Sequence, residues 1–337
     1  MKVVNPRSKY GNDMTPIVEK FITSASIRVL HSFAKSVGEK LNLFRKLSGD
    51  SFVAIVCGGD FDRVFFRELV AAILDECTTR KLVPIIIDTT RPNTLEFRLA
   101  GLETLGKALS GILYLPAASS AEGRRKMIDF IKRTSRPVVI VDKSNDSEFL
   151  DTKNVKFSHY DNYKLSEAMR SILDAHSKDE SVYWVCHESP MSENGKIRYG
   201  SYANHFRGTI SCDPIKSRDD SYRKSLMHMI STNETSKCMT FVCLNDDIAL
   251  GVDDAAFALH TGVGGHIQEL PHIRIWSYDC TRSLMERRKT GDLKFICGGT
   301  VQDVSELARD SLDKIASLSL SNSAFGNDLS PKQTIIL

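Results

Sequence analysis

The sequence lacks the features that define several large classes of protein. No apolar run approaches the ~18 residues of a membrane span, and the opening stretch MKVVNPRSKYGND has no signal-peptide apolar core. The eight cysteines include no CxxC pair, and the nine histidines form neither an HExxH motif nor a cluster at zinc spacing. We therefore expect a cytoplasmic protein with reduced cysteines and without a membrane span or a metal site.

Motifs of common enzyme classes are also missing. There is no P-loop, no GxGxxG after a predicted strand and no nucleophile–base pair, and the glycine pairs at 58–59 and 298–299 do not have such spacings. We expect a protein that is not an enzyme and that needs no cofactor.

Charge is nearly balanced overall but uneven along the chain. The 337 residues carry a net charge of +3, whereas residues 1–50 hold nine Lys/Arg and four Asp/Glu, a net of +5. The remainder is therefore about −2 (3 − 5). A basic segment permits contact with nucleic acid, and it is equally typical of solvated helices. Apolar positions at helical spacing in 15–46 predict short helices that pack on the body, on a second subunit or on DNA.

From residue 51 the pattern alternates between strands and helices. Four apolar runs separated by amphipathic segments predict strands at 52–57, 82–88, 111–115 and 137–142. After a polar stretch at 144–154, read as a crossover, the alternation restarts with strands at 155–159, 182–187, 209–211, 240–244, 273–278, 295–301 and 334–337. Nearly continuous apolar strands are typical of parallel sheets covered on both faces. The sequence predicts an α/β protein with two doubly wound lobes and a ligand cleft between them.

The stretch TFVCLNDDIALG (240–251) shows how a site is built on such a sheet. A buried strand delivers Asn245, Asp246 and Asp247 directly to the start of a helix. Ligands bind at the carboxyl ends of the strands in open α/β sheets, and Asn or Asp before a helix also serves as a cap. The stretch alone leaves both ligand contact and helix capping open for these three residues.

Eight motifs, in order, give the sequence a family resemblance. They are RKLSGDSFVAIVCGG with VFFREL, SGILYLP, RPVVIVDK, VKFSHYDN, FVCLNDDIALG, IRIWSYDC, GDLKFICGGTVQD and PKQTIIL. Residues 50–337 resemble the type I periplasmic-binding-protein fold of ribose-type sugar-binding proteins and of the effector core of lac-repressor-type regulators. The resemblance implies a first lobe of 51–143 plus 303–325 and a second lobe of 144–302 plus 326–337. The basic helical segment at 1–50 stands where lac-repressor-type regulators hold their DNA-binding domain.

The resemblance also implies site residues. Phe65 and Phe66 match an aromatic pair that stacks on a sugar ring, and Asp246 matches a carboxylate that accepts bonds from hydroxyls. The resemblance thus makes Asp246 the ligand candidate, with Asn245 and Asp247 supporting the turn and the helix start. The remaining implied contacts are Ser119, Ser120, Asp279 and Gln302. Phe65 or Phe66 can equally pack a helix into the core, and Asp279 can equally be a turn residue.

The sequence departs from the family at several places. The usual arginine of the second lobe is absent at its strict position, where Lys196 or Arg198 could substitute; we select Arg198. The loop GGDFDR makes Asp60 and Arg63 candidates for lining an altered pocket. Residues 1–50 have no recognisable helix-turn-helix motif, and only Arg28-Val29-Leu30-His31 is weakly similar to one.

Two functions remain open. One is the effector-sensing core of a transcriptional regulator, dimeric as the resemblance implies, in which a sugar, polyol or related metabolite closes the lobes and residues 1–50 act on DNA or on a protein partner. The other is a stand-alone solute-binding protein, or a sensor subunit, that does not bind DNA.

Overall fold

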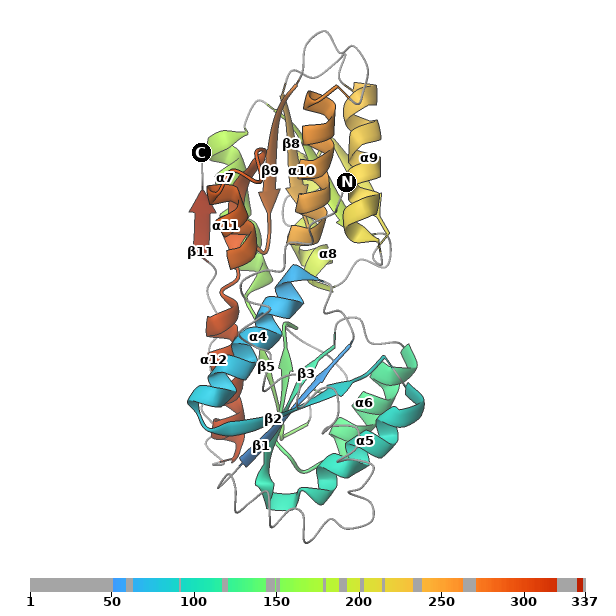
Figure 1. Ribbon diagram of the computed structural model, residues 1–337, viewed down its shortest axis with the longest axis vertical. Coiled ribbons are helices and arrows are strands. Elements are labelled where there is room, and N and C mark those ends of the chain that lie inside the picture. The colour runs from blue at the N-terminus through green and yellow to red at the C-terminus, as the bar shows by residue number, and fades with distance from the viewer. Residues whose placement is uncertain are drawn as a thin grey trace, which may run out of the picture.

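The structure is a computed structural model that describes residues 51–58, 63–90, 92–116, 121–143, 149, 152–177, 180–187, 193–200, 203–213, 216–232, 238–262, 271–319 and 332–335. The predicted helices within 15–46 lie outside these residues, as do Asp60, Ser119 and Ser120. Two α/β lobes lie end to end along the long axis of the molecule (Figure 1). The predicted fold class is confirmed.

The N-lobe is built on a parallel sheet of order β2-β1-β3-β4-β5. Its elements are β1 (Ser51–Cys57), α4 (Val64–Thr79), β2 (Leu82–Asp88), α5 (Pro92–Thr104), the short 3-10 turn η2 (Gly106–Ala108), β3 (Leu109–Leu115), α6 (Ala121–Arg133), β4 (Val138–Val141), β5 (Val155–Ser158) and α12 (Val304–Ser319). Alternate residues of β1 explain the two covered faces. Val53 and Ile55 belong to the cluster that includes α4 and α12, whereas Phe52 and Ala54 belong to the cluster that includes α5 and α6.

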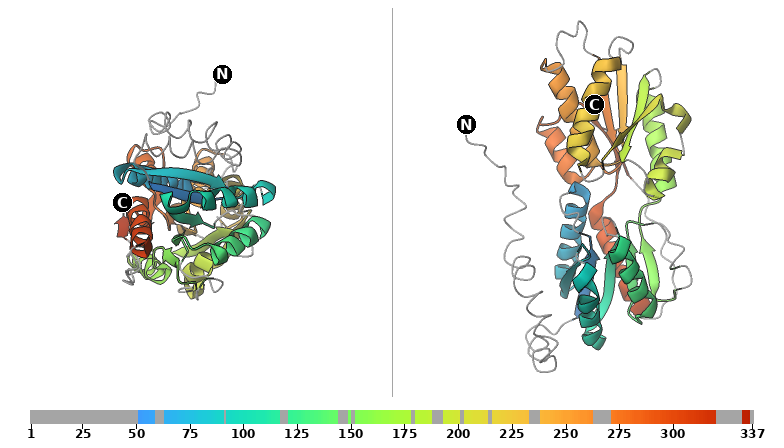
Figure 2. Two further views of the ribbon diagram at one scale, coloured as in Figure 1. Left: turned by 90° about the horizontal axis from the view of Figure 1, so that it is seen from below. Right: turned by 90° about the vertical axis from the view of Figure 1, so that its right-hand side faces the viewer.

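The C-lobe sheet has the order β11-β10-β9-β8-β6-β7, with only β11 antiparallel. Its elements are α7 (Asn162–His176), β6 (Ser181–His187), α8 (Glu193–Gly200), η4 (Ala203–His205), β7 (Gly208–Cys212), α9 (Ser217–Thr232), β8 (Cys238–Cys243), α10 (Asp246–His260), β9 (His272–Ser277), α11 (Arg282–Lys289), β10 (Ile296–Val301) and β11 (Lys332–Ile335). Helices α9, α10 and α11 cover one face, and α7 and α8 cover the other (Figure 2).

The predicted boundary between the lobes falls one strand too early. The polar stretch 144–154 does not cross to the C-lobe, because β5 pairs in parallel with β4 in the first sheet. The chain crosses after Ser158 instead and returns after β10. The Tyr160 hydroxyl joins these two crossings: it accepts a hydrogen bond from the Asp303 backbone N–H at 3.0 Å and lies 3.2 Å from Glu306 Oε2.

One hydrophobic cluster continues across both lobes. It includes Phe65 and Phe66 of α4 together with Leu244, Ile248 and Leu284 of the C-lobe. Helix α4 extends from the N-lobe to the C-lobe beside α12, to which Arg80 is joined by an ion pair with Asp313 at 2.8 Å (Figure 1). The lobes therefore meet through packed side chains as well as through the crossing segments.

Close packing of α9 against α10 depends on Gly251. A Cβ atom at this position would lie 2.0 Å from Ser221 Oγ and 2.3 Å from the Arg218 carbonyl oxygen. We expect Gly251→Ala to lower the free energy of unfolding by about 1–3 kcal/mol through overpacking, measured by urea denaturation. Gly200→Ala is the matched control, since its Cβ meets no described atom within 4 Å. Equal stabilities of the two variants would contradict this account.

Candidate functional site

Polar side chains collect where the carboxyl ends of both sheets meet. Asp142 follows β4, His187 ends β6 and Asn245 follows β8. Asp279 and Gln302 follow the neighbouring strands β9 and β10. These positions, which lie far apart in the sequence, become neighbours because all five strands run toward the junction of the two lobes. This is the edge at which open α/β sheets bind ligands.

Arg198 lies at the centre of this group. Helix α8 carries it, and its side chain is buried beside Asp279, with 3.5 Å between Arg198 Nη1 and Asp279 Oδ1. The guanidinium also donates to Asn162 Oδ1 at 2.9 Å and to the Leu244 carbonyl at 3.0 Å, and it lies 5.0 Å from the centre of the Tyr278 ring. The structure thus places the predicted Arg198 in the interlobe group, whereas Lys196 is exposed.

Asp279 and Gln302, both predicted, are brought together. Gln302 Nε2 donates to Asp279 Oδ1 at 2.8 Å, and both residues are buried. Burial raises the pKa of Asp279 to about 8; Arg198 opposes the rise, and the negative charges of Asp246, Asp142 and Asp247 add to it. Because these carboxylates outnumber the buried guanidinium, the group holds a proton near neutral pH.

Asp142 was not predicted as a site residue, although the structure brings it to the same place. Its backbone is left-handed, with φ 60°, which aspartate tolerates better than most residues. Burial raises its pKa to about 6, against the opposing charge of Arg198. A strained backbone that holds a desolvated carboxylate is a feature of binding and catalytic sites.

Asp246 has a different environment from the one the motif suggested. Its Oδ1 accepts from Ser277 Oγ at 2.6 Å and from the Cys280 backbone N–H at 3.0 Å, and its Oδ2 accepts from the Thr281 backbone N–H at 2.8 Å. The residue is 1% exposed. Asp246 therefore anchors the loop after β9, in which Cys280 has a φ of 38°. Contact between Asp246 and a ligand stays a prediction, and its carboxylate already serves three donors.

Asn245 and Asp247, the other two polar residues of the motif, have different contacts. Asn245 Oδ1 accepts from the Ile248 backbone N–H at 3.0 Å, which is the predicted cap, and its Nδ2 lies 3.0 Å from His187 Nε2. Asp247 instead lies toward the N-lobe. Burial raises its pKa to about 6, whereas Arg63 and a hydrogen bond from the Val64 backbone lower it. Asp247 is thus a direct link to the start of α4.

Arg63 joins the site from the N-lobe side. Its charge acts on Asp247, and it also helps burial to lower the pKa of His187 to about 4. Next to it, the predicted stacking pair Phe65 and Phe66 is 6% and 8% exposed, with ring centroids 5.8 Å apart in an edge-on arrangement. Both rings pack in the core, the alternative that the sequence left open, and stacking on a ligand stays a prediction.

A second direct link between the lobes lies beside α4. Glu68 Oε1 accepts a hydrogen bond from the Ser283 backbone N–H at 2.9 Å and another from the Ser283 hydroxyl. Ser283 lies in the first turn of α11, where backbone N–H groups lack partners within the helix and attract an anion. The carboxylate of one lobe therefore caps a helix of the other.

Two polar atoms in the group have unmet hydrogen-bonding capacity. Among the described residues, His187 Nδ1 and Asn194 Oδ1 are buried and find no hydrogen-bond partner. Asn194 Nδ2 donates to the Asp142 backbone carbonyl at 3.3 Å, so the unpartnered Asn194 oxygen lies beside Asp142. Leaving such atoms buried without a partner costs about 1–3 kcal/mol each, which a bound polar molecule would recover.

Comparisons with known proteins agree with this architecture. No family model matches the sequence, and no curated protein matches it. A solute-binding protein of an ABC transporter from Bacillus halodurans, solved with myo-inositol, is 14% identical with a TM-score of 0.62, over 86% of this chain and 95% of that one.

Two further solved structures are similar to this chain in fold. A Caulobacter myo-inositol binding protein is 16% identical with a TM-score of 0.60, covering 84% of this chain and 92% of its own. A LacI family transcriptional regulator from Arthrobacter, in complex with lactose, is 13% identical with a TM-score of 0.60, covering 85% and 98%. The chain has the type I periplasmic-binding-protein fold. Within the described residues, no helix is long and apolar enough to cross a membrane.

The carboxylate group makes stability depend on pH with a definite sign. Between the ordinary aspartate value of 3.8 and about 8, folded Asp279 keeps a proton that the unfolded chain has lost. Stability should therefore fall as pH rises from 6.5 to 8, by at most about 1.4 kcal/mol per pH unit. His187, whose pKa is lowered from 6.5 to about 4, has the opposite effect: it adds stability as pH rises from about 4 to 6.5, and this contribution levels off above pH 6.5.

Urea denaturation at several pH values measures this slope. Asp142→Asn should make it shallower, because it removes a charge that raises the pKa of Asp279, and asparagine also tolerates the left-handed backbone. Asp174→Asn, at a carboxylate 58% exposed, is the control and should leave the slope unchanged. Stability that rises between pH 6.5 and 8 would contradict the assignment.

Proposed function

We propose that this protein binds a small polyhydroxylated molecule, a sugar or polyol, between its lobes. The observation that carries the proposal is the convergence of Arg198, Asp279 and Asp142 with the unpartnered polar atoms of His187 and Asn194. Carboxylates accept bonds from hydroxyls, whereas guanidinium and amide groups donate them. A molecule with several hydroxyl groups can satisfy both kinds of partner.

The structural neighbours support this chemistry. The neighbours described above were solved with myo-inositol or lactose, and their names describe binding proteins and a regulator. That supports a binding protein over an enzyme. The group at the junction has its own composition: Asp142 and Asp279 lie beside the buried Arg198, and Asp247 lies beside Arg63. The ligand we propose therefore has the neighbours' general chemistry, while its identity depends on this acidic arrangement.

We propose that binding acts through the relative position of the lobes. A ligand shifts a conformational equilibrium only by its difference in affinity for the two states. Contacts that already join the lobes, such as Glu68 with Ser283 and Asp247 with the start of α4, define one state. A ligand that bridges Asp142 of the N-lobe and Arg198 of the C-lobe would favour that state.

The role we favour is the effector-sensing core of an intracellular, dimeric transcriptional regulator. The net charge of +5 in residues 1–50 supports contact with DNA, and the likeness to a LacI family regulator is consistent with it. All eight cysteines are free, which suits a reducing compartment such as the cytoplasm. The likeness to solute-binding proteins keeps the second role, a solute-binding or sensor protein without DNA binding, as an alternative.

Ligand binding is tested by thermal shift with sugars, sugar phosphates, polyols and nucleosides. A ligand at 100 times its Kd should stabilise the folded protein by about 2.7 kcal/mol. Arg198→Lys and Asp279→Asn should each weaken binding at least tenfold, because both remove partners at the centre of the site. Arg170→Lys, at a surface ion pair, is the control for Arg198→Lys and should bind normally. Normal binding by both site variants would refute the proposed site.

Asp246→Asn distinguishes anchoring from direct contact. Because its oxygens hold the loop after β9, we expect the substitution to lower the melting temperature of the free protein as well as ligand affinity. A variant that keeps its melting temperature and loses only ligand binding would instead support direct contact.

DNA binding is tested with the full chain and duplex DNA at low and moderate salt, with and without a ligand found by thermal shift. Replacing Lys35, Lys40 and Arg45 with glutamine should weaken binding and reduce its salt dependence. The control replaces Arg125, Lys132 and Arg133, which are exposed on α6, and should bind as the parent does. Absence of binding under all conditions would favour the alternative role.

A further inference from the structure

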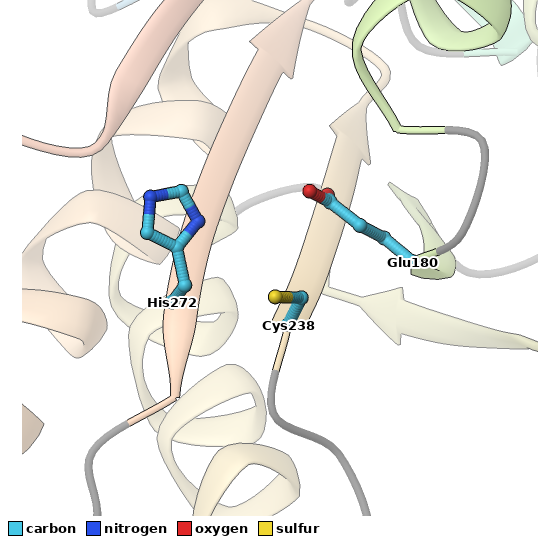
Figure 3. Close-up of side chains that lie close together, drawn as sticks. All are labelled: Glu180, Cys238 and His272. Carbon is cyan, nitrogen blue, oxygen red and sulfur yellow. The ribbon is translucent and has the colours of Figure 1, made fainter.

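Three side chains of metal-binding types meet at the amino-terminal ends of the C-lobe strands, opposite the interlobe site. Cys238 is the first residue of β8 and His272 the first residue of β9, and the two are paired directly across the parallel ladder. Glu180 precedes β6, whose Ser181 pairs with Met239, so Glu180 lies level with Cys238. Figure 3 shows the three side chains at the starts of these segments.

The distances suit one ion. The His272 ring nitrogen, the Cys238 thiol sulfur and a Glu180 carboxylate oxygen all lie within 4.8 Å of one another. A tetrahedral zinc site needs ligand atoms roughly 3.3–3.8 Å apart, a change that side-chain rotation can supply. His272 is exposed, and Glu180 and Cys238 are half-buried, so an ion has access from solvent.

We propose that Glu180, Cys238 and His272 bind a divalent transition metal of the zinc type, with water as the fourth ligand. One thiolate, one imidazole and one carboxylate form a ligand set that zinc and cobalt accept. Neither magnesium nor calcium fits, since both prefer several oxygen ligands, and this group offers a single carboxylate.

The surroundings of Glu180 strengthen the choice of metal. Arg274 and the Thr240 hydroxyl both donate to its carboxylate, one to each oxygen. Ligating carboxylates are commonly held by such outer hydrogen bonds, which fix their orientation. The positive charge of Arg274 also opposes any ion that depends on electrostatic attraction alone, and therefore favours a metal that bonds to the thiolate.

The proposed ion would join the starts of three adjacent strands. It would lie about 20 Å from the polar group at the other end of the sheet, given the rise of roughly 3.3 Å per strand residue. We therefore expect the metal to stabilise the C-lobe and to leave ligand binding between the lobes unchanged.

The test uses the full chain, stripped of metal with a chelator and kept reduced. Zinc binding is measured by calorimetry, and cobalt binding by absorption, in which a thiolate ligand gives a charge-transfer band. We expect one bound ion per chain, a higher melting temperature with zinc, and no response to magnesium. His272→Ala and Cys238→Ser should each weaken zinc binding at least tenfold, and Cys238→Ser should abolish the cobalt–thiolate band.

Matched controls identify the ligands. Cys297→Ser changes the other half-buried cysteine, and His260→Ala changes another exposed histidine; both should keep full zinc affinity. His272 is exposed at a strand start, so His272→Ala should fold, as far-ultraviolet circular dichroism would show. A cobalt spectrum without a thiolate band, or unchanged zinc affinity in His272→Ala and Cys238→Ser, would overturn the proposal whether or not the lobes bind a sugar.

Discussion

The buried guanidinium of Arg198 is the interaction on which the centre of the molecule depends. It joins α8 to Asn162 at the start of α7, to the carbonyl at the end of β8, and to Asp279 after β9. A buried cation is tolerated only when hydrogen bonds and counter-charges replace its water. Arg198 thereby fixes the relative positions of these elements at the junction of the two lobes.

The carboxylates around that cation give the site its character. Asp142, Asp247 and Asp279 all have raised pKa values because burial removes their water. Arg198 opposes the rise for Asp142 and Asp279, and Arg63 opposes it for Asp247. Desolvated groups of this kind gain most from a ligand whose hydroxyls donate to them. The raised pKa of Asp279 also makes the stability of the free protein depend on pH.

Much of the fold could be predicted from the sequence. Apolar runs located the strands of both sheets, because a strand buried on both faces must be apolar at nearly every position. The error at 144–154 has a physical cause as well. A polar stretch shows that a segment is exposed, but only hydrogen bonding decides that β5 joins β4 rather than the second sheet. The proline, glycine and charged residues around β5 do not indicate which sheet the strand joins.

The apolar runs predicted the fold class and the strand positions, and the motifs named Asp279 and Gln302 as site candidates. Arg198 was selected only as a substitute for an arginine that is absent at its usual position. The different roles of neighbouring carboxylates depend on how the chain folds. Asp246 anchors a loop, Asp247 lies toward the N-lobe, and Asp142 enters the site from a distant strand. The same holds for Glu180, Cys238 and His272, whose spacing in the sequence resembles no metal motif. Side chains meet through strand register and lobe contact, which depend on residues far apart in the chain.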